Sequence, residues 1–231
     1  MKKQIYYTAL GHFRRRHEIG GKTYPVVIVN RREYCMDLQE MTLWTCLNWR
    51  FLDLEQARQH YNKLAGEVPM TPLRSFEGCL DRLLVRGVVA SGTGDTGIDA
   101  LYDLLSGLYV VPISESFPLR LAAYLKMTLL DGVPRTRARS LFQKDRPNEQ
   151  ERQVLALSRQ ALLSTAELIK CAERGVQDVS SDWKLMAALY GDADTTSDNI
   201  REMMRGAKKL EPVTVAVANL YLRRQIVFEC V

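Results

Sequence analysis

The clearest candidates for chemistry in this 231-residue sequence are clustered arginines, because guanidinium groups bind phosphate and carboxylate groups. One cluster is Arg14-Arg15-Arg16, within a segment (residues 1–32) that carries eight lysines and arginines against one glutamate. A second cluster follows residue 134. The whole chain has a net charge of +5, so the part beyond residue 32 is slightly acidic. This distribution favours contact with nucleic-acid phosphates, and the alternative is a solvated surface with internal ion pairs.

The sequence lacks the usual signatures of catalysis. It contains no GxSxG or HExxH motif, and its three histidines leave little material for a catalytic triad. Gly92, Gly94 and Gly97 fit the pattern GxGxxG, but no βαβ unit with an acidic partner completes a dinucleotide site. We therefore expect no enzyme activity and no cofactor, and we interpret these glycines as a turn.

Cysteine and apolar patterns limit the remaining classes of protein. Five cysteines without a CxxC pair exclude a complete disulfide framework, and the histidines are not spaced to complete a zinc site. The apolar stretches are shorter than the roughly 20 residues that span a bilayer, and the N-terminus lacks an apolar secretory segment. We expect no metal, no membrane span and a cytoplasmic location.

Two β-rich segments position the first arginine cluster. Ile5–Leu10 and Tyr24–Val29 are rich in β-branched and aromatic residues, and Gly20-Gly21 lies between them. These segments predict a β-hairpin or small sheet, with the three arginines on it or beside it.

Three helices and a strand are expected next. Asp37 and Asp53 are suited to cap the first two helices, and Thr71-Pro72 is a suitable start for the third. Gly87 ends the third helix, and a short strand with a flexible glycine-rich turn through Gly97 follows.

The same succession of elements recurs near the C-terminus. Helices are predicted from Trp183 to Tyr190, from Thr195 to about Lys209 and from Pro212 to Arg224, before a β-rich end. Leu83–Val89 aligns without a gap with Tyr221–Val227. The repeated order indicates an internal duplication.

The segment between the two modules is predicted as helix, extended chain, helix and linker. Ile98–Leu108 is expected to be helical, Tyr109–Ile113 extended, and a helix that begins at residues 116–118 reaches Leu130. The basic segment Gly132–Asn148 is the expected linker.

A long helix is expected from Glu149 to about Arg174. Leu155, Leu162 and Ile169 recur in it at seven-residue intervals. Such a stripe packs against its own domain or against a second copy, so a homodimer is the alternative here.

These elements predict a mostly α protein with small β-hairpins, an α+β fold of two modules joined by helices and a basic linker. The expected domains are residues 1–113, with the hairpin and first module; residues 114–148, with a connecting helix and the linker; and residues 149–231. Hydrophobic residues make up 46% of the chain, enough for a core. Trp44, Trp49 and Trp183 lie on apolar helical faces and are expected in that core.

The order of three helices, strand and turn in both modules resembles that of winged-helix transcription regulators. The resemblance implies that each third helix enters the major groove of double-stranded DNA while the turn contacts the backbone. With the two basic clusters, the residues expected to contact nucleic acid are Arg14, Arg15, Arg16, Arg74, Ser75, Arg82, Arg135, Arg137, Arg139, Thr214, Asn219 and Arg223.

Residues 24 to about 90 have a second, looser similarity. A hairpin precedes Tyr34-Cys35-Met36-Asp37-Leu38 and then Leu43-Trp44-Thr45-Cys46-Leu47, which is similar to peptide-binding winged-helix domains of the PqqD type. This similarity implies capture of an extended peptide at an exposed strand edge.

The sequence therefore leaves two functions open. The first is a DNA-binding transcription regulator, or a replication or partition factor of a mobile element. The second is a protein or peptide interaction module without nucleic-acid binding, favoured by Glu77 and Asp81 on the first module's third helix, since carboxylates repel phosphates.

Overall fold

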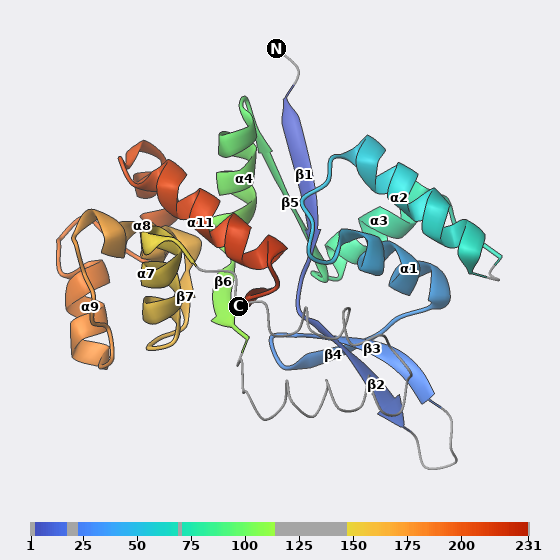
Figure 1. Cartoon of the computed structure of the whole chain (residues 1–231), viewed down its shortest axis with the longest axis horizontal. Coiled ribbons are helices and arrows are strands. Elements are labelled where there is room, and N and C mark those ends of the chain that lie inside the picture. The colour runs from blue at the N-terminus through green and yellow to red at the C-terminus, as the bar shows by residue number, and fades with distance from the viewer. Residues whose placement is uncertain (1–2, 18–22, 69–70, 114–146, 231) are drawn as a thin grey trace.

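The computed structural model describes residues 3–17, 23–68, 71–113 and 147–230, which form an α+β fold (Figure 1). This described part contains three small antiparallel sheets. The first pairs β1 (Gln4–Ala9) with β5 (Val89–Gly94), and the second has the order β2 (His12–His17), β3 (Thr23–Val29), β4 (Arg32–Cys35). In the third, β6 (Tyr109–Pro112) lies between β7 (Leu163–Ser164) and β8 (Ile226–Glu229).

The predicted pairing of Tyr24–Val29 with Ile5–Leu10 is wrong. β3 pairs with β2, whereas Ile5 and its neighbours on β1 pair with β5, more than 80 positions away. Gly11, with a φ of 73°, separates β1 from β2, and a Cβ there would lie 2.1 Å from the Ile28 carbonyl oxygen. This glycine lets the chain turn out of one sheet and into the next.

Helices α1 (Leu38–Leu47), α2 (Leu54–Glu67) and α3 (Phe76–Val85) follow the second sheet. Asp37 and Asp53 cap the first two with reciprocal capping boxes, as the sequence predicts. The third helix begins later than Thr71-Pro72, because the Ser75 hydroxyl accepts a hydrogen bond from the Gly78 amide at 3.1 Å and caps it.

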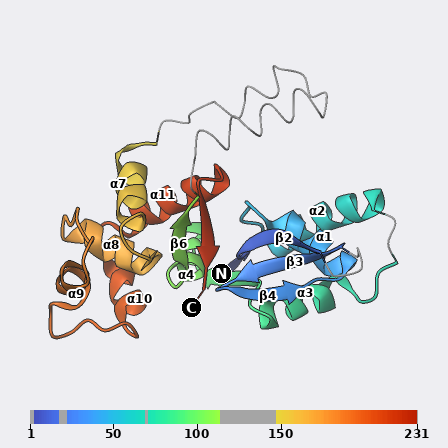
Figure 2. The same ribbon diagram turned by 90° about the horizontal axis from the view of Figure 1, so that it is seen from below.

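The second half is mainly helical. It contains α4 (Gly97–Leu105), α7 (Glu149–Ser158), α8 (Thr165–Glu173), α9 (Asp182–Tyr190), α10 (Ile200–Met203), the 3-10 turn η2 (Met204–Gly206) and α11 (Leu210–Leu222). Figure 2 shows β6 and α4 on the side of this half that lies toward α1–α3. None of the described helices combines the length and apolar character that a bilayer crossing needs.

The long helix expected from Glu149 to Arg174 is two helices. Between them β7 pairs with β6, and the Ser164 hydroxyl with Glu167 forms a capping box that starts α8. Leu155 and Ile169 are buried in the core of this same chain, while Leu162 lies between the helices and is 54% exposed. The three residues do not form one stripe, so they give no support to a dimer.

The two halves repeat one arrangement of elements. In the first half, β1 pairs with β5 on one side. On its other side, Tyr7 of β1 forms an isolated bridge with Leu52, which lies in the segment between α1 and α2. In the second, β6 lies between β8 and β7, which joins α7 and α8. α3 and α11 are the last helices before the outer strands, and α9 and α10 are additional in the second half.

Backbone hydrogen bonds give the register of this repeat. The Val88 amide donates to the Leu83 carbonyl at 3.1 Å, and the Gln225 amide donates to the Leu220 carbonyl at 2.9 Å. Both bonds close the same C-terminal turn, with Gly87 and Arg224 at positive φ. Leu83 therefore corresponds to Leu220, one residue away from the gapless sequence alignment.

The glycine-rich segment after α3 is a strand packed under a helix. A Cβ at Gly92 would lie 2.2 Å from the Leu104 amide nitrogen, and a Cβ at Gly94 would lie 2.3 Å from the Ala100 amide nitrogen. These glycines allow α4 to approach β5 closely, so the expectation of a free, flexible turn is wrong for them.

The buried residues of both halves form one continuous hydrophobic core. Trp44 is buried in it, as expected, and its indole donates a hydrogen bond to the Leu10 carbonyl at 3.1 Å. Trp49 is half-buried at the edge of the core. Trp183 is 81% exposed, contrary to prediction, because it lies on the outer side of the short helix α9.

Candidate binding surfaces

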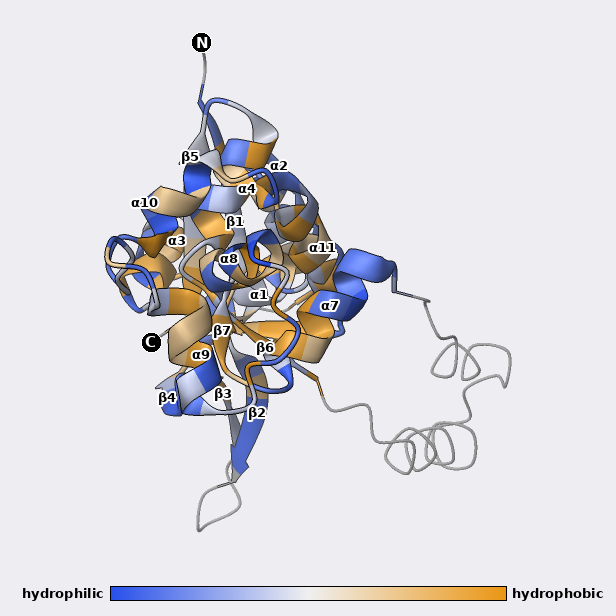
Figure 3. Ribbon diagram, turned by 90° about the vertical axis from the view of Figure 1, so that its left-hand side faces the viewer, coloured by the Kyte–Doolittle hydropathy of each residue, from blue (hydrophilic) through white to orange (hydrophobic). Residues whose placement is uncertain are grey.

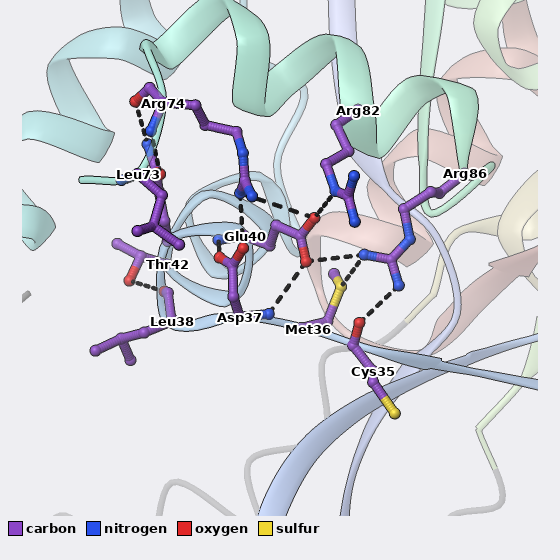
Figure 4. Close-up of polar contacts among 11 residues, drawn as sticks. Cys35, Met36, Asp37, Leu38, Glu40, Thr42, Leu73, Arg74, Arg82 and Arg86 are labelled. Carbon is purple, nitrogen blue, oxygen red and sulfur yellow. Dashed lines mark hydrogen bonds and ion pairs between the residues drawn. The ribbon is translucent and has the colours of Figure 1, made fainter. Parts of the chain in front are cut away.

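The arginines predicted on the first module's third helix surround a buried carboxylate (Figure 4). Glu40 is 2% exposed, and its Oε1 accepts a hydrogen bond from the Arg82 Nε at 2.5 Å. Its Oε2 accepts one from the Arg86 Nη1 at 2.8 Å, while Arg74 donates to the Asp37 Oδ2 at 2.6 Å. These contacts join α3 to the start of α1.

The cluster has a clear structural role. Partial burial acts to raise the pKa of Asp37, but hydrogen bonds from the Glu40 amide and from Arg74 lower it overall. Ser75 is exposed and caps α3, while Arg74 is half-buried and Arg82, although 55% exposed, is bonded to Glu40. The helical spacing predicts an outward face for these residues, but the position of Glu40, four residues before Trp44, gives no sign of its burial.

The third helix of the second module lies in the core. α11 packs against α7, α8 and α4. Thr214 is fully buried, so its predicted outward position is wrong, and Asn219 is half-buried. Arg223 reaches the surface, but its Nη1 donates to the buried Glu151 Oε2 at 2.9 Å. Apolar residues on both sides of α11 explain this burial.

The second basic cluster cannot be placed in the structure. Arg135, Arg137 and Arg139 lie outside the described residues. The first cluster is placed, on strand β2.

The three arginines of the Arg14–Arg16 cluster differ in their pairing. Arg16 forms an ion pair with Glu33 on β4. Arg14 and Arg15 are exposed and have no carboxylate partner within ion-pair distance in the part of the chain that the structure describes. In Figure 3, β2 lies at the lower edge of the body and is coloured as hydrophilic. Two cations are thus available to an external partner.

A groove that the sequence did not predict lies between β2 and α1. Its volume is about 780 Å³. Phe13 and Leu38, which are 43% and 51% exposed, lie on its opposite sides. The remaining lining is mainly apolar and comes from β2, β3 and α1: Arg15, Tyr24, Pro25, Met41, Trp44, Thr45 and Asn48.

This groove follows an open strand edge. β2 pairs only with β3 in the described part of the chain, so its outer backbone groups are available for another strand. The opposite edge, β4, is partly occupied, because the Arg86 Nη2 donates to the Cys35 carbonyl at 2.6 Å. The alternation of Phe13 with the arginines was the one sequence signal for this surface, since it puts an apolar and a basic side chain on one face.

Thiol and metal chemistry receive little support from the described residues. Burial raises the pKa of Cys46, Cys79 and Cys171 to about 11, which keeps these thiols protonated and unreactive. No group of three or more histidine, cysteine, aspartate or glutamate side chains is close enough to hold a metal within the described ranges.

Comparisons with protein-family models, with curated proteins and with solved structures find no match to this chain.

Proposed function

We propose that this chain is a protein-interaction module that binds an extended segment of a partner protein along β2. The observation that carries the proposal is the mainly apolar groove between α1 and an edge strand with one paired side. An added strand would bond to the β2 backbone, and every second side chain would enter the groove. The looser similarity to PqqD-type domains agrees with this mode of binding.

Charge indicates the kind of segment. Phe13, Leu38 and Met41 provide apolar contacts, while Arg15 provides a cation without a carboxylate partner in the described chain. Arg14 lies on the other face of the same strand, also unpaired there. A complementary segment alternates apolar residues with aspartate or glutamate. The free cysteines agree with a reducing compartment such as the cytoplasm, where we place the protein.

A displayed library of random 12-residue peptides, selected against the full chain, tests the proposal. Enriched peptides should alternate apolar and acidic residues, and hydrogen exchange should show protection of the β2 amides on binding. Phe13→Ser and Leu38→Gln should each weaken binding of an enriched peptide by about tenfold, since each removes an exposed apolar contact.

Val85→Ser is the matched control, because Val85 is an exposed apolar residue at the end of α3 and does not line the groove. Peptides that bind the Phe13 and Leu38 variants as tightly as the unmodified chain would contradict the proposal. So would a selection without any enriched peptide.

Nucleic-acid binding is the second candidate, favoured by the unpaired Arg14 and Arg15 and by the winged-helix resemblance. Contact would be made by β2 to phosphates, because Arg74, Arg82 and Arg223 are bonded to carboxylates. Fluorescence anisotropy with mixed duplex DNA at two salt concentrations tests it. Binding should be salt-sensitive and should weaken in the Arg14→Ala/Arg15→Ala double variant more than in Arg159→Ala. Absence of binding at low salt removes this candidate.

A further inference from the structure

A second cavity lies where the two repeats meet. Its volume is about 600 Å³. Its walls come from the end of α1 and the residues after it, from one face of α2, and from Arg224 in the turn between α11 and β8. It adjoins the groove beside β2, with which it shares Thr45 and Asn48, but its lining is different in character.

The lining of this cavity is basic. Arg50, Lys63 and Arg224 contribute three cationic side chains, and His60 adds an imidazole. None of the four lies within ion-pair distance of a carboxylate among the residues that the structure describes, although the Arg50 Nη1 donates to the Cys46 carbonyl at 3.0 Å. Glu67, the acid in the lining, forms no ion pair in the same described part. The arginines of the Glu40 cluster are all bonded to carboxylates, so these unpaired cations stand apart from them.

The backbone around the cavity has an uncommon conformation. Trp49 has a φ of 62° and Arg224 a φ of 59°, in the left-handed region that bulky residues rarely adopt. The Trp49 amide donates to the Tyr221 hydroxyl at 3.0 Å, and the Arg224 amide donates to the Tyr221 carbonyl at 2.8 Å. One buried tyrosine therefore positions the backbone of Trp49 and of Arg224 beside the cavity.

We propose that this cavity binds a small organic phosphate that carries a planar ring, of the nucleoside diphosphate class. Its volume is within the range of small-molecule sites. Three cations match the several negative charges of a diphosphate better than the single charge of a carboxylate. The half-buried Trp49 ring lines the same cavity and offers a surface on which a planar ring stacks.

The site is distinct from the proposed peptide groove and does not depend on it. Because both repeats supply its walls, a bound ligand contacts α2 of the first and the α11–β8 turn of the second. Ligand binding is then expected to stabilise the junction of the repeats.

Isothermal titration calorimetry of the full chain with ADP, inorganic pyrophosphate and adenosine tests the proposal. ADP should bind most tightly, since it alone supplies both the charge and the ring. Lys63→Gln should weaken ADP binding about tenfold, and Glu67→Gln should strengthen it by removing a repelling carboxylate. Both residues are exposed on α2, so neither change removes a core contact.

Lys208→Gln is the matched control, because it removes the same charge from an exposed position before α11, outside the cavity. Equal weakening by Lys63→Gln and Lys208→Gln would assign the binding to general charge and overturn the site. The absence of binding of ADP would overturn it as well. Pyrophosphate that binds as tightly as ADP would contradict a contribution of the planar ring to binding. A 12-base-pair duplex that binds more tightly than ADP and depends on Lys63 would assign the cations to nucleic acid instead.

Discussion

The hydroxyl of Tyr221 on α11 donates a hydrogen bond to the carbonyl oxygen of Ala9 on β1, at 3.1 Å and across 212 positions of the chain. The Tyr221 hydroxyl oxygen also accepts a bond from the Trp49 amide at 3.0 Å and lies 2.9 Å from the Thr8 Oγ1. Burial raises the pKa of Tyr221 to about 12, so the hydroxyl remains a neutral donor at physiological pH. The last helix of the second repeat is thereby bonded to the first strand of the first repeat.

Replacement of this hydroxyl should destabilise the whole chain. Tyr221→Phe leaves the partly buried Trp49 amide and the buried Ala9 carbonyl without this partner, and we expect the free energy of unfolding to fall by about 1–3 kcal/mol. Urea denaturation followed by circular dichroism measures the change. Tyr6→Phe is the control, because the Tyr6 hydroxyl makes an exposed bond to Gln4, and it should change stability by less than about 0.5 kcal/mol. Equal midpoints for the two variants would contradict this account.

Two glycine-to-alanine changes should have opposite effects. Gly92→Ala puts a Cβ 2.2 Å from the Leu104 amide nitrogen, so α4 must move away from β5, at a cost of about 1–3 kcal/mol. Gly66 lies in α2 with no atom within 4 Å of a Cβ, and alanine there should stabilise the protein by about 0.5–1 kcal/mol. Thermal unfolding of both variants measures this. A Gly92 variant as stable as the unmodified chain would show that α4 is not closely packed on β5.

The contribution of Asp192 to stability should depend on pH. Hydrogen bonds from Thr195 and from the buried Lys170, whose Nζ lies 2.9 Å from the Asp192 Oδ2, hold the pKa of this carboxyl below its usual value of 3.8. A lowered pKa in the folded state stabilises the fold at pH values above 3.8, and this stabilisation is lost as the pH falls below that value. Asp192→Asn should therefore lower the urea midpoint at pH 7 and have a smaller effect at pH 3.

Asp95→Asn is the control for that series, since Asp95 is exposed and has no ion pair among the described residues. Its effect should be small at both pH values. A difference between Asp192→Asn and the unmodified chain that stays constant from pH 7 to pH 3 would show that the ion pair does not contribute.

Alkylation of the native protein should distinguish the cysteines. Cys35 is exposed on β4, whereas burial raises the pKa of Cys46, Cys79 and Cys171 to about 11. With iodoacetamide at pH 8, Cys35 should react at least about tenfold faster than these three, as mapped by peptide mass spectrometry. Cys35→Ser should abolish the fast modification, and urea should make the buried thiols reactive. Rapid labelling of Cys46 in the native state would contradict its burial.

Although the repeat was predicted with the helices α9 and α10 in place of α7 and α8, the α+β class and the capping of α1 and α2 by Asp37 and Asp53 could be predicted from sequence. These features depend on neighbouring residues: a capping box needs only positions three apart, and an apolar helical stripe needs only its own spacing. The break between α7 and α8 was missed because the seven-residue spacing of Leu155, Leu162 and Ile169 continues across it. Pairing of β7 with β6, which is more than 50 positions away, decides where the first helix ends.

The sequence by itself determined where the arginines are, and the tertiary structure decided which of them are available to a partner. Arg82 and Arg86 reach the buried Glu40, more than 40 positions away, and Arg223 reaches Glu151, 72 positions away. Arg14, Arg15 and the cations around the second cavity have no such partner in the described chain. Charge along a sequence is a local property, whereas the pairing of charges depends on which distant carboxylates folding brings within about 4 Å.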